Sequence, residues 1–282
     1  MDAKKQNTGA VINSRETDAA PSAPVVNADR ARSASAEELK LLLYDPREEI
    51  LLALLENPKL EDAHVTTLLG RADLTANVIV TVAGNAKWHA RESIRLALAR
   101  HPRTPKRIAL SALRQLFLFD LARLSLLPSA PADVRRAAEE MILGRAPHLP
   151  VGEKLTLARR GPARVAGALL AEGHPQAIKL ALDNAFLTES QVLKVLATPG
   201  VHERVVAAIA QHRKWSHMYS VRVALIRNAS APAQHVLAIL PDLTLRDLKD
   251  LAGLESLAPH VRKYIEKELR RRSEKAENRA QR

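Results

Sequence analysis

An internal repeat spans much of this chain of 282 residues. When the sequence is shifted by 127 positions, residues 57–142 align with residues 184–269 without a gap, and 26 of the 86 aligned positions are identical. The matches include the chain's two tryptophans, Trp88 and Trp215, each preceded by a lysine. Because a gapless block of this length holds several helices and their turns, it predicts a repeat architecture made from two copies of one unit.

The composition indicates that the repeated unit is helical. Hydrophobic residues make up 46% of the chain but aromatic residues only 3%, because most apolar positions are alanine or leucine. Both residues favour helices, whereas strands prefer β-branched and aromatic side chains. Many repeated apolar positions are three or four residues apart, as one buried face of a helix requires. The predicted fold class is therefore all-α.

We expect about seventeen short antiparallel helices, joined by turns of two to six residues. They are predicted in a repeat domain over residues 37–270, between a disordered N-terminal tail (1–36) and a charged C-terminal tail (271–282). The predicted spans are 37–44, 46–56, 60–70, 75–85, 90–100, 105–115, 118–126, 131–143, 152–160, 163–171, 174–183, 188–197, 201–211, 217–227, 232–240, 245–253 and 258–271.

The turns "ENPKL" and "HPRTP" give the chain a family likeness. Together with the repeat, they make it resemble the HEAT-like α-helical solenoids, and in particular their leucine-rich-variant branch. The resemblance implies a stack of helix pairs with a curved surface that binds a macromolecule. It departs from the family pattern at Ala185 and Ala229, which stand where the first copy has Pro58 and Pro102.

The charge of the chain is strongly positive and unevenly placed. The formal net charge is +12, and residues 87–114 hold eight basic residues against Glu92 alone. On a stack of repeats such residues would line one surface and attract an anionic partner. The candidate residues for that contact are Lys87, Arg91, Arg95, Arg103, Lys106, Arg107, Lys214 and Arg222.

Four repeated residues are better explained by structure than by binding. Trp88 and Trp215 are expected to pack as wedges between helices, because a repeat copies its skeleton most faithfully. Asp120 and Asp247 are acids kept in both copies at a similar distance from Arg95 and Arg222. We expect them to pair with Arg95 and Arg222, which would link adjacent helices.

The sequence offers no pattern of catalytic or cofactor-binding residues. It has no cysteine, no metal-binding HExxH motif, no phosphate-binding glycine loop and no nucleophile elbow. No apolar run approaches the roughly 20 residues that cross a membrane. We therefore expect a non-enzymatic cytoplasmic protein without cofactor, metal or small-molecule substrate.

Two functions fit these observations. The leading one is a scaffold whose curved face engages a macromolecular partner, most readily a protein. The alternative is a nucleic-acid-binding HEAT-like protein that contacts DNA or RNA through a basic groove. A DNA glycosylase of this architecture would need an acid beside tryptophan and arginine, for which Asp120 with Trp88 is the one candidate. The duplication argues against a glycosylase, since a single active site would not need both copies of these residues.

Overall fold

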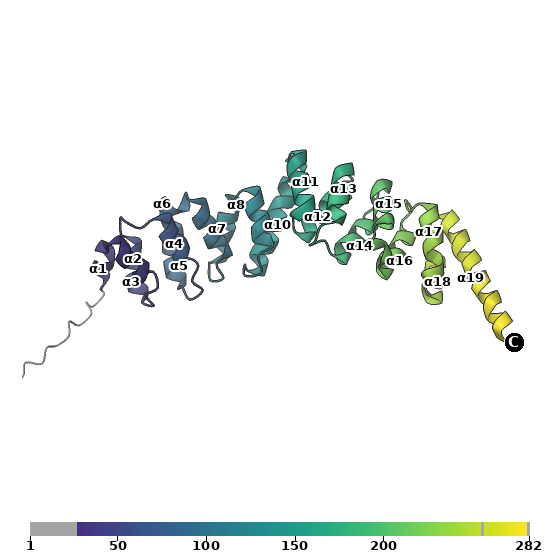
Figure 1. Cartoon of the computed structure of the whole chain (residues 1–282), viewed down its shortest axis with the longest axis horizontal. Coiled ribbons are helices and arrows are strands. Elements are labelled where there is room, and N and C mark those ends of the chain that lie inside the picture. The colour runs from purple at the N-terminus through teal and green to yellow at the C-terminus, as the bar shows by residue number, and fades with distance from the viewer. Residues whose placement is uncertain (1–26, 255–256, 281–282) are drawn as a thin grey trace, which may run out of the picture. The chain divides into compact units, whose positions relative to one another are not determined.

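The computed structural model describes residues 27–254 and 257–280, which form helices joined by short turns (Figure 1). Within these residues there is no β-strand, and 17 helices have seven or more residues. The all-α prediction and each of the seventeen predicted helices are therefore confirmed. Two short helices were not predicted, α1 (Ala28–Ser33) and α6 (Ala86–His89). Residues 1–26 of the predicted tail lie outside the described residues, and α1 occupies part of the remainder.

The chain divides into two compact units, residues 1–64 and 65–282. In the first unit, α1 and α2 (Ala36–Leu42) pack against α3 (Glu48–Leu55). Ser35 begins α2 with a capping box, in which its side chain accepts from the Glu38 N–H and Glu38 accepts from the Ser35 N–H. These exchanged bonds satisfy two amide groups at the helix start. Ala31 and Leu54 are fully buried between the helices.

The second unit contains the remaining helices, each packed mainly against its neighbours in the chain. The boundary between the units falls inside α4 (Asp62–Leu68). The helices after it are α5 (Ala76–Gly84), α6, α7 (Glu92–Arg100), α8 (Lys106–Arg114), α9 (Leu118–Ser125), α10 (Ala132–Arg145), α11 (Val151–Arg160), α12 (Ala163–Ala171), α13 (Pro175–Leu182), α14 (Glu189–Ala197), α15 (Glu203–Gln211), α16 (Tyr219–Arg227), α17 (Ala233–Ile239), α18 (Leu245–Ala252) and α19 (Pro259–Ala280).

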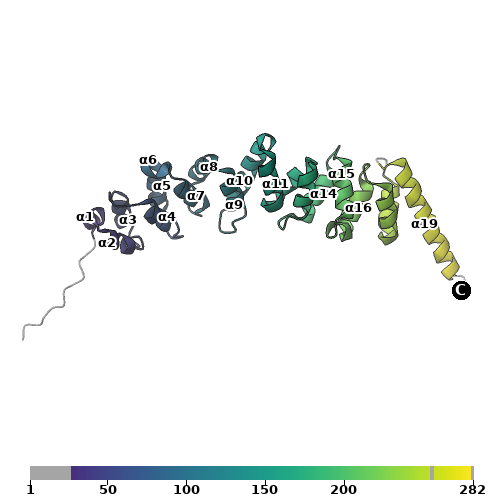
Figure 2. The same ribbon diagram turned by 45° about the horizontal axis from the view of Figure 1, so that its top comes forward.

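From α11 to α16 the helices alternate between two rows. In one row α11 packs against α13 and α13 against α15, while in the other α12 packs against α14 and α14 against α16. Figures 1 and 2 both show α14 and α16 side by side. This alternation follows from the short turns, because a turn of a few residues returns the chain antiparallel to the helix before it.

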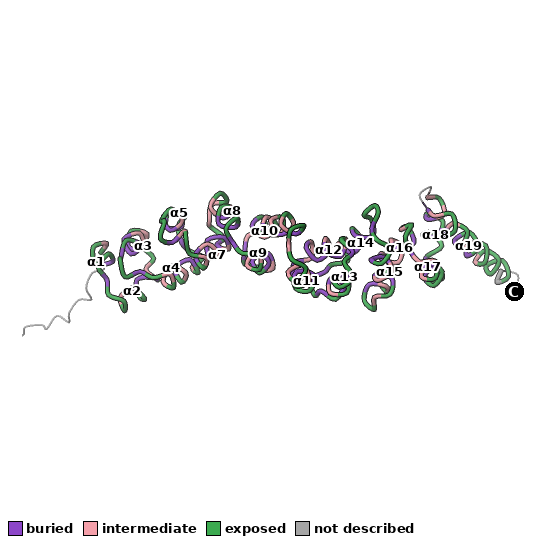
Figure 3. The backbone as a smooth tube through the Cα atoms, turned by 90° about the horizontal axis from the view of Figure 1, so that it is seen from above, coloured by how far each residue is buried: buried purple, intermediate pink, exposed green. Residues whose placement is uncertain are grey.

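Burial follows the helical periodicity. Buried and exposed residues alternate along each helix of the second unit (Figure 3), and a contiguous set of buried apolar side chains runs from Ala99 to Ile265 in chain order. The last helix, α19, continues past residue 270 to Ala280, into the segment predicted as a charged tail. None of the described helices combines the length and apolar composition needed to span a membrane.

Candidate binding groove and repeated contacts

The two tryptophans lie in the core in closely similar surroundings. Each is 1% exposed, and the Nζ of the preceding lysine lies over the indole ring, 4.2 Å from the ring centroid of Trp88 and 4.0 Å from that of Trp215. Lys87 and Lys214 thus stack on buried rings in the same way. The ring nitrogens differ in their bonding: Trp215 Nε1 donates to the Leu182 carbonyl at 2.9 Å, whereas Trp88 Nε1 meets no acceptor within the described residues.

Arg95 and Arg222 make equivalent local bonds, but not to the acids that we predicted. Arg95 donates to the His89 carbonyl and to the Gln115 side chain, which are 6 and 20 residues away. Arg222 repeats both spacings, since it donates to the Ser216 carbonyl at 2.8 Å and to the Asp242 carboxylate at 2.7 Å. The predicted links to Asp120 and Asp247 are wrong. In both copies the guanidinium instead bonds to the turn before its own helix and to a residue five positions before the predicted acid.

Asp120 and Asp247 instead contact residue 92 or its counterpart 219. Asp247 accepts hydrogen bonds from Tyr219 and Thr244, and those hydroxyls hold its pKa below the usual range. In the first copy the facing residue is Glu92 rather than tyrosine. Partial burial, together with a hydrogen bond to Asp120, raises the pKa of the Glu92 carboxyl. Trp88, which the glycosylase alternative pairs with Asp120, is enclosed in the core.

The remaining candidate basic residues are exposed, but one of them is bonded to the backbone of its own chain. Arg103 bridges to the end of the preceding turn, where its Nη1 donates to the carbonyls of Asp73 at 3.0 Å and Leu74 at 3.2 Å. Arg91 occupies the N-cap position of α7 without a side-chain capping bond, and Lys106 and Arg107 are exposed in the first turn of α8. Of the eight candidates, Lys106 and Arg107 are therefore those most available to a phosphate or a carboxylate.

Further repeated contacts extend beyond those predicted from the sequence. Asn57 and Asn184 are buried, and each donates its side-chain amide to carbonyls 26 and 23 residues earlier. Arg145 donates to the carbonyls of Leu116 and Arg114, and Arg272 donates to the corresponding ones of Leu243 and Pro241. Arg145 and Arg272 lie just past the aligned block at the same 127-residue spacing, which is the signal that could have identified them.

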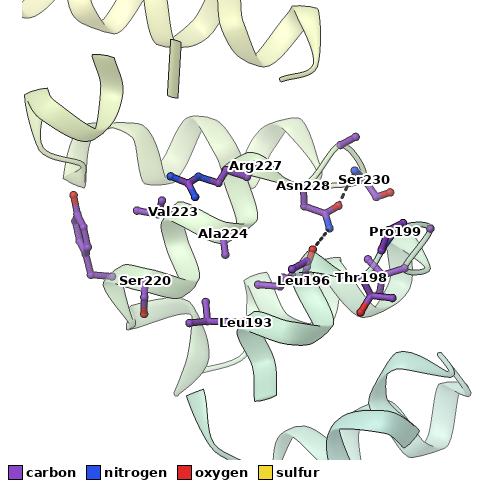
Figure 4. Close-up of a pocket in the computed structure, with 15 residues that line it drawn as sticks. Leu193, Leu196, Thr198, Pro199, Ser220, Val223, Ala224, Arg227, Asn228 and Ser230 are labelled. Carbon is purple, nitrogen blue, oxygen red and sulfur yellow. Dashed lines mark hydrogen bonds between the residues drawn. The ribbon is translucent and has the colours of Figure 1, made fainter. Parts of the chain in front are cut away.

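A groove between α14 and α16 has a volume of about 710 Å³. Figure 4 shows Leu193 and Leu196 of α14 facing Val223 and Ala224 of α16, with Arg227 at the end of α16. Arg227 is the one charged residue that lines it. The full lining is Leu193, Leu196, Ala197, Thr198, Pro199, Gly200, Val201, Tyr219, Ser220, Val223, Ala224, Arg227, Asn228, Ala229 and Ser230.

Two lining residues of the groove are much smaller than the residues aligned with them in 57–142. Thr198 and Ser230 stand at the positions of Arg71 and Arg103 in the first copy. Because serine cannot span the distance that Arg103 spans, the bridge from residue 103 to the preceding turn has no counterpart here. The bond that remains comes from Asn228, which donates to the Leu196 carbonyl at 2.8 Å and accepts from the Ser230 N–H (Figure 4). This site was not predicted from the sequence, because its small side chains carry no charge and form no recognisable motif.

Comparison with known proteins gave no match among family models, curated proteins or solved structures.

Proposed function

We propose that this chain is a non-catalytic HEAT-like α-solenoid that binds a segment of a partner protein in the groove between α14 and α16. The architecture in this proposal has two supports, the helix packing and the repeated contacts. Short helices in two rows, each packed on its neighbours, are the unit from which solenoids are made. A stack of this kind offers long grooves between adjacent helices of one row, where protein segments can lie.

The repeated contacts support the duplication in the proposal. Four kinds of side chain at the 127-residue spacing make corresponding bonds: the buried asparagines, the lysine-stacked tryptophans, the arginines at 95 and 222, and the arginines at 145 and 272. These contacts hold particular turns and helix ends in place, which the burial of an apolar helix face does not require. Such agreement in bonded partners goes beyond what helical periodicity alone would require.

The observation that carries the binding function is the groove itself. Its floor is formed by aliphatic side chains that are only partly covered, such as Leu193 and Val223, and it has room for side chains of another molecule. Grooves lined by apolar residues with a few polar groups are typical of binding sites. No group of three or more side chains suited to a metal ion was found within the described residues.

The nucleic-acid alternative receives less support from the contacts. Arg95, Arg103 and Arg222 direct guanidinium groups to carbonyls of their own chain, which leaves fewer cations for phosphates. Lys106 and Arg107 remain exposed, so salt-dependent binding of duplex DNA is the measurement for this alternative. Under the proposed function, binding at physiological salt is weak and does not change when both residues are replaced by alanine.

Site-directed photo-crosslinking in the native host tests the proposed function. A benzophenone side chain at Thr198, which lines the groove, is expected to capture a discrete protein on irradiation. The matched control carries the same group at Glu203, an exposed residue of α15 outside the groove. Adducts of equal yield at both positions, no protein adduct at Thr198, or an adduct with nucleic acid would overturn the proposal.

A further inference from the structure

The only charged side chain among the lining residues of the groove is a cation. Arg227 is exposed at the end of α16 and makes no hydrogen bond or ion pair with the described residues. Two acids are bonded to lining residues, since Asp247 accepts from the Tyr219 hydroxyl and Glu189 from the Ser220 hydroxyl, and the Asp247 carboxylate also attracts Arg227 without a direct contact. Among the lining residues a ligand therefore meets one cation, which forms no direct ion pair, and no carboxylate.

Two further polar side chains of the groove are bonded within the chain. The amide of Asn228 is bonded to Leu196 and Ser230, and the Thr198 hydroxyl donates to the Lys194 carbonyl. This leaves an apolar floor, made by residues such as Leu193 and Val223, next to one guanidinium. Guanidinium groups form strong paired hydrogen bonds with carboxylates, and an apolar floor favours an aliphatic side chain.

We propose that the groove binds an acidic peptide segment whose aliphatic side chain enters between α14 and α16 and whose neighbouring carboxylate pairs with Arg227. This rests on the proposed function and gives the chemistry of the bound segment. The small residues Thr198 and Ser230 keep the site open, whereas the corresponding arginines of the first copy are held by their own chain. The duplicated unit thus has one copy closed by an arginine bridge and one copy open to a partner.

The first copy suggests a variant that closes the groove. Arg103 bonds to the carbonyls of Asp73 and Leu74, whose counterparts in the second copy are Gly200 and Val201. A Ser230→Arg substitution is expected to form the equivalent bridge and to occupy the groove with its own guanidinium. Ala224→Phe, which fills the floor from α16, is a second way to close the site if the new arginine fails to bridge.

The test measures fluorescence anisotropy with the full chain and two labelled peptides. The probe is fluorescein-labelled Gly-Glu-Leu-Glu-Glu-Leu-Gly, and its matched peptide has glutamine in place of every glutamate. We expect the acidic peptide to bind at least about tenfold more tightly than the glutamine peptide at physiological salt, since the ion pair to Arg227 is lost without the carboxylates. Ser230→Arg and Ala224→Phe are expected to weaken acidic-peptide binding by about tenfold or more.

Arg227→Glu is the decisive variant, and Arg100→Glu is its control. Arg100 holds the corresponding position of the first copy, so both variants change the net charge of this basic chain by the same amount. Arg227→Glu should abolish binding of the acidic peptide, and Arg100→Glu should leave it within about twofold. Equal effects of the two variants, or equal binding of the two peptides, would overturn the inference. If the benzophenone group at Thr198 still captures a protein, either of these results would exclude the acidic segment but leave the proposed function unaffected.

Discussion

The side-chain amide of Asn184 donates a hydrogen bond of 2.8 Å to the carbonyl oxygen of Ala158, and a second of 3.0 Å to Gly161. Asn184 is 2% exposed and follows α13, while both acceptors belong to the end of α11. One buried side chain therefore satisfies two carbonyls at a helix end that has no further helical turn to bond them. Asn57 does the same for Ala31 and Ala34 in the first unit.

Asn184→Ala is expected to lower the free energy of unfolding by about 3 kcal/mol, because it leaves buried carbonyls without donors. Urea denaturation followed by circular dichroism measures the change. Gln211→Ala, an exposed site on α15, serves as the control and should shift the free energy by no more than about 0.5 kcal/mol. If the two variants were equally stable, Asn184 would not hold these helix ends together.

Arg222 is expected to couple energetically to Asp242 and not to Asp247. The Arg222–Asp242 ion pair measures 2.7 Å, but the aspartate side chain is 53% exposed, so we expect a coupling energy of only about 0.5 kcal/mol. Arg222→Ala alone should cost about 1–2 kcal/mol, since it also loses the bond to the Ser216 carbonyl. Two double-mutant cycles, one for Arg222 with Asp242 and one for Arg222 with Asp247, measure these coupling energies. A larger coupling energy for Arg222 with Asp247 would contradict the observed contacts.

The two tryptophans should differ in their tolerance of phenylalanine. Trp215→Phe removes both ring volume and the hydrogen bond to the Leu182 carbonyl, whereas Trp88→Phe removes an N–H that has no acceptor within the described residues. We expect Trp215→Phe to cost about 1 kcal/mol more than Trp88→Phe. Equilibrium denaturation of the two single variants gives the difference. Equal costs would indicate that the Trp215 bond contributes nothing to stability.

The helical pattern could be predicted from the sequence because it depends on local chemistry. Alanine and leucine at three- and four-residue spacing define both the helices and their buried faces, so all seventeen predicted helices are present. Helix α6 was missed because its four residues carry no period, and its start depends on the exposed Asn85, which accepts from the Lys87 N–H. Here a single capping residue, and not a pattern, determines the structure.

The contacts between elements were harder to predict. The identical residues Arg222 and Asp247 were expected to pair because both are conserved between the copies. The actual partner, Asp242, corresponds to Gln115 in the first copy. The two residues differ in type, but both have a side-chain oxygen that accepts a hydrogen bond from the arginine, so a search for identical residues could not find this pair. The groove was missed for the opposite reason, since it depends on the absence of large side chains at Thr198 and Ser230.

The stability of α19 should depend on pH through Glu268. Hydrogen bonds from Arg271, and then from Arg272, lower the pKa of Glu268 to about 2. Because the pKa is depressed in the folded state, this stabilisation is present above about pH 4.5 and is lost as the pH falls toward 2. Glu268→Gln should therefore cost about 2 kcal/mol at pH 7 and almost nothing near pH 2. Glu266→Gln, at an exposed site on the same helix, should show no such dependence in thermal melts.

Glu92 should affect stability in the opposite direction. Partial burial and the nearby Asp120 carboxyl raise its pKa, so the folded state binds a proton more tightly than the unfolded chain does. The stability that Glu92 contributes is therefore fully present below its unfolded-state pKa of about 4.5, and it is lost as the pH rises through the raised folded-state pKa.

Glu92→Gln keeps the shape of the protonated carboxyl, so the variant should melt at a higher temperature than the wild type at pH 7 and at the same temperature near pH 4. Thermal melts across this range, with Glu203→Gln on α15 as an exposed control, measure the effect. A Glu92→Gln variant that melts lower than the wild type at pH 7 would mean that attraction between Glu92 and Arg95 outweighs the cost of two adjacent carboxylates.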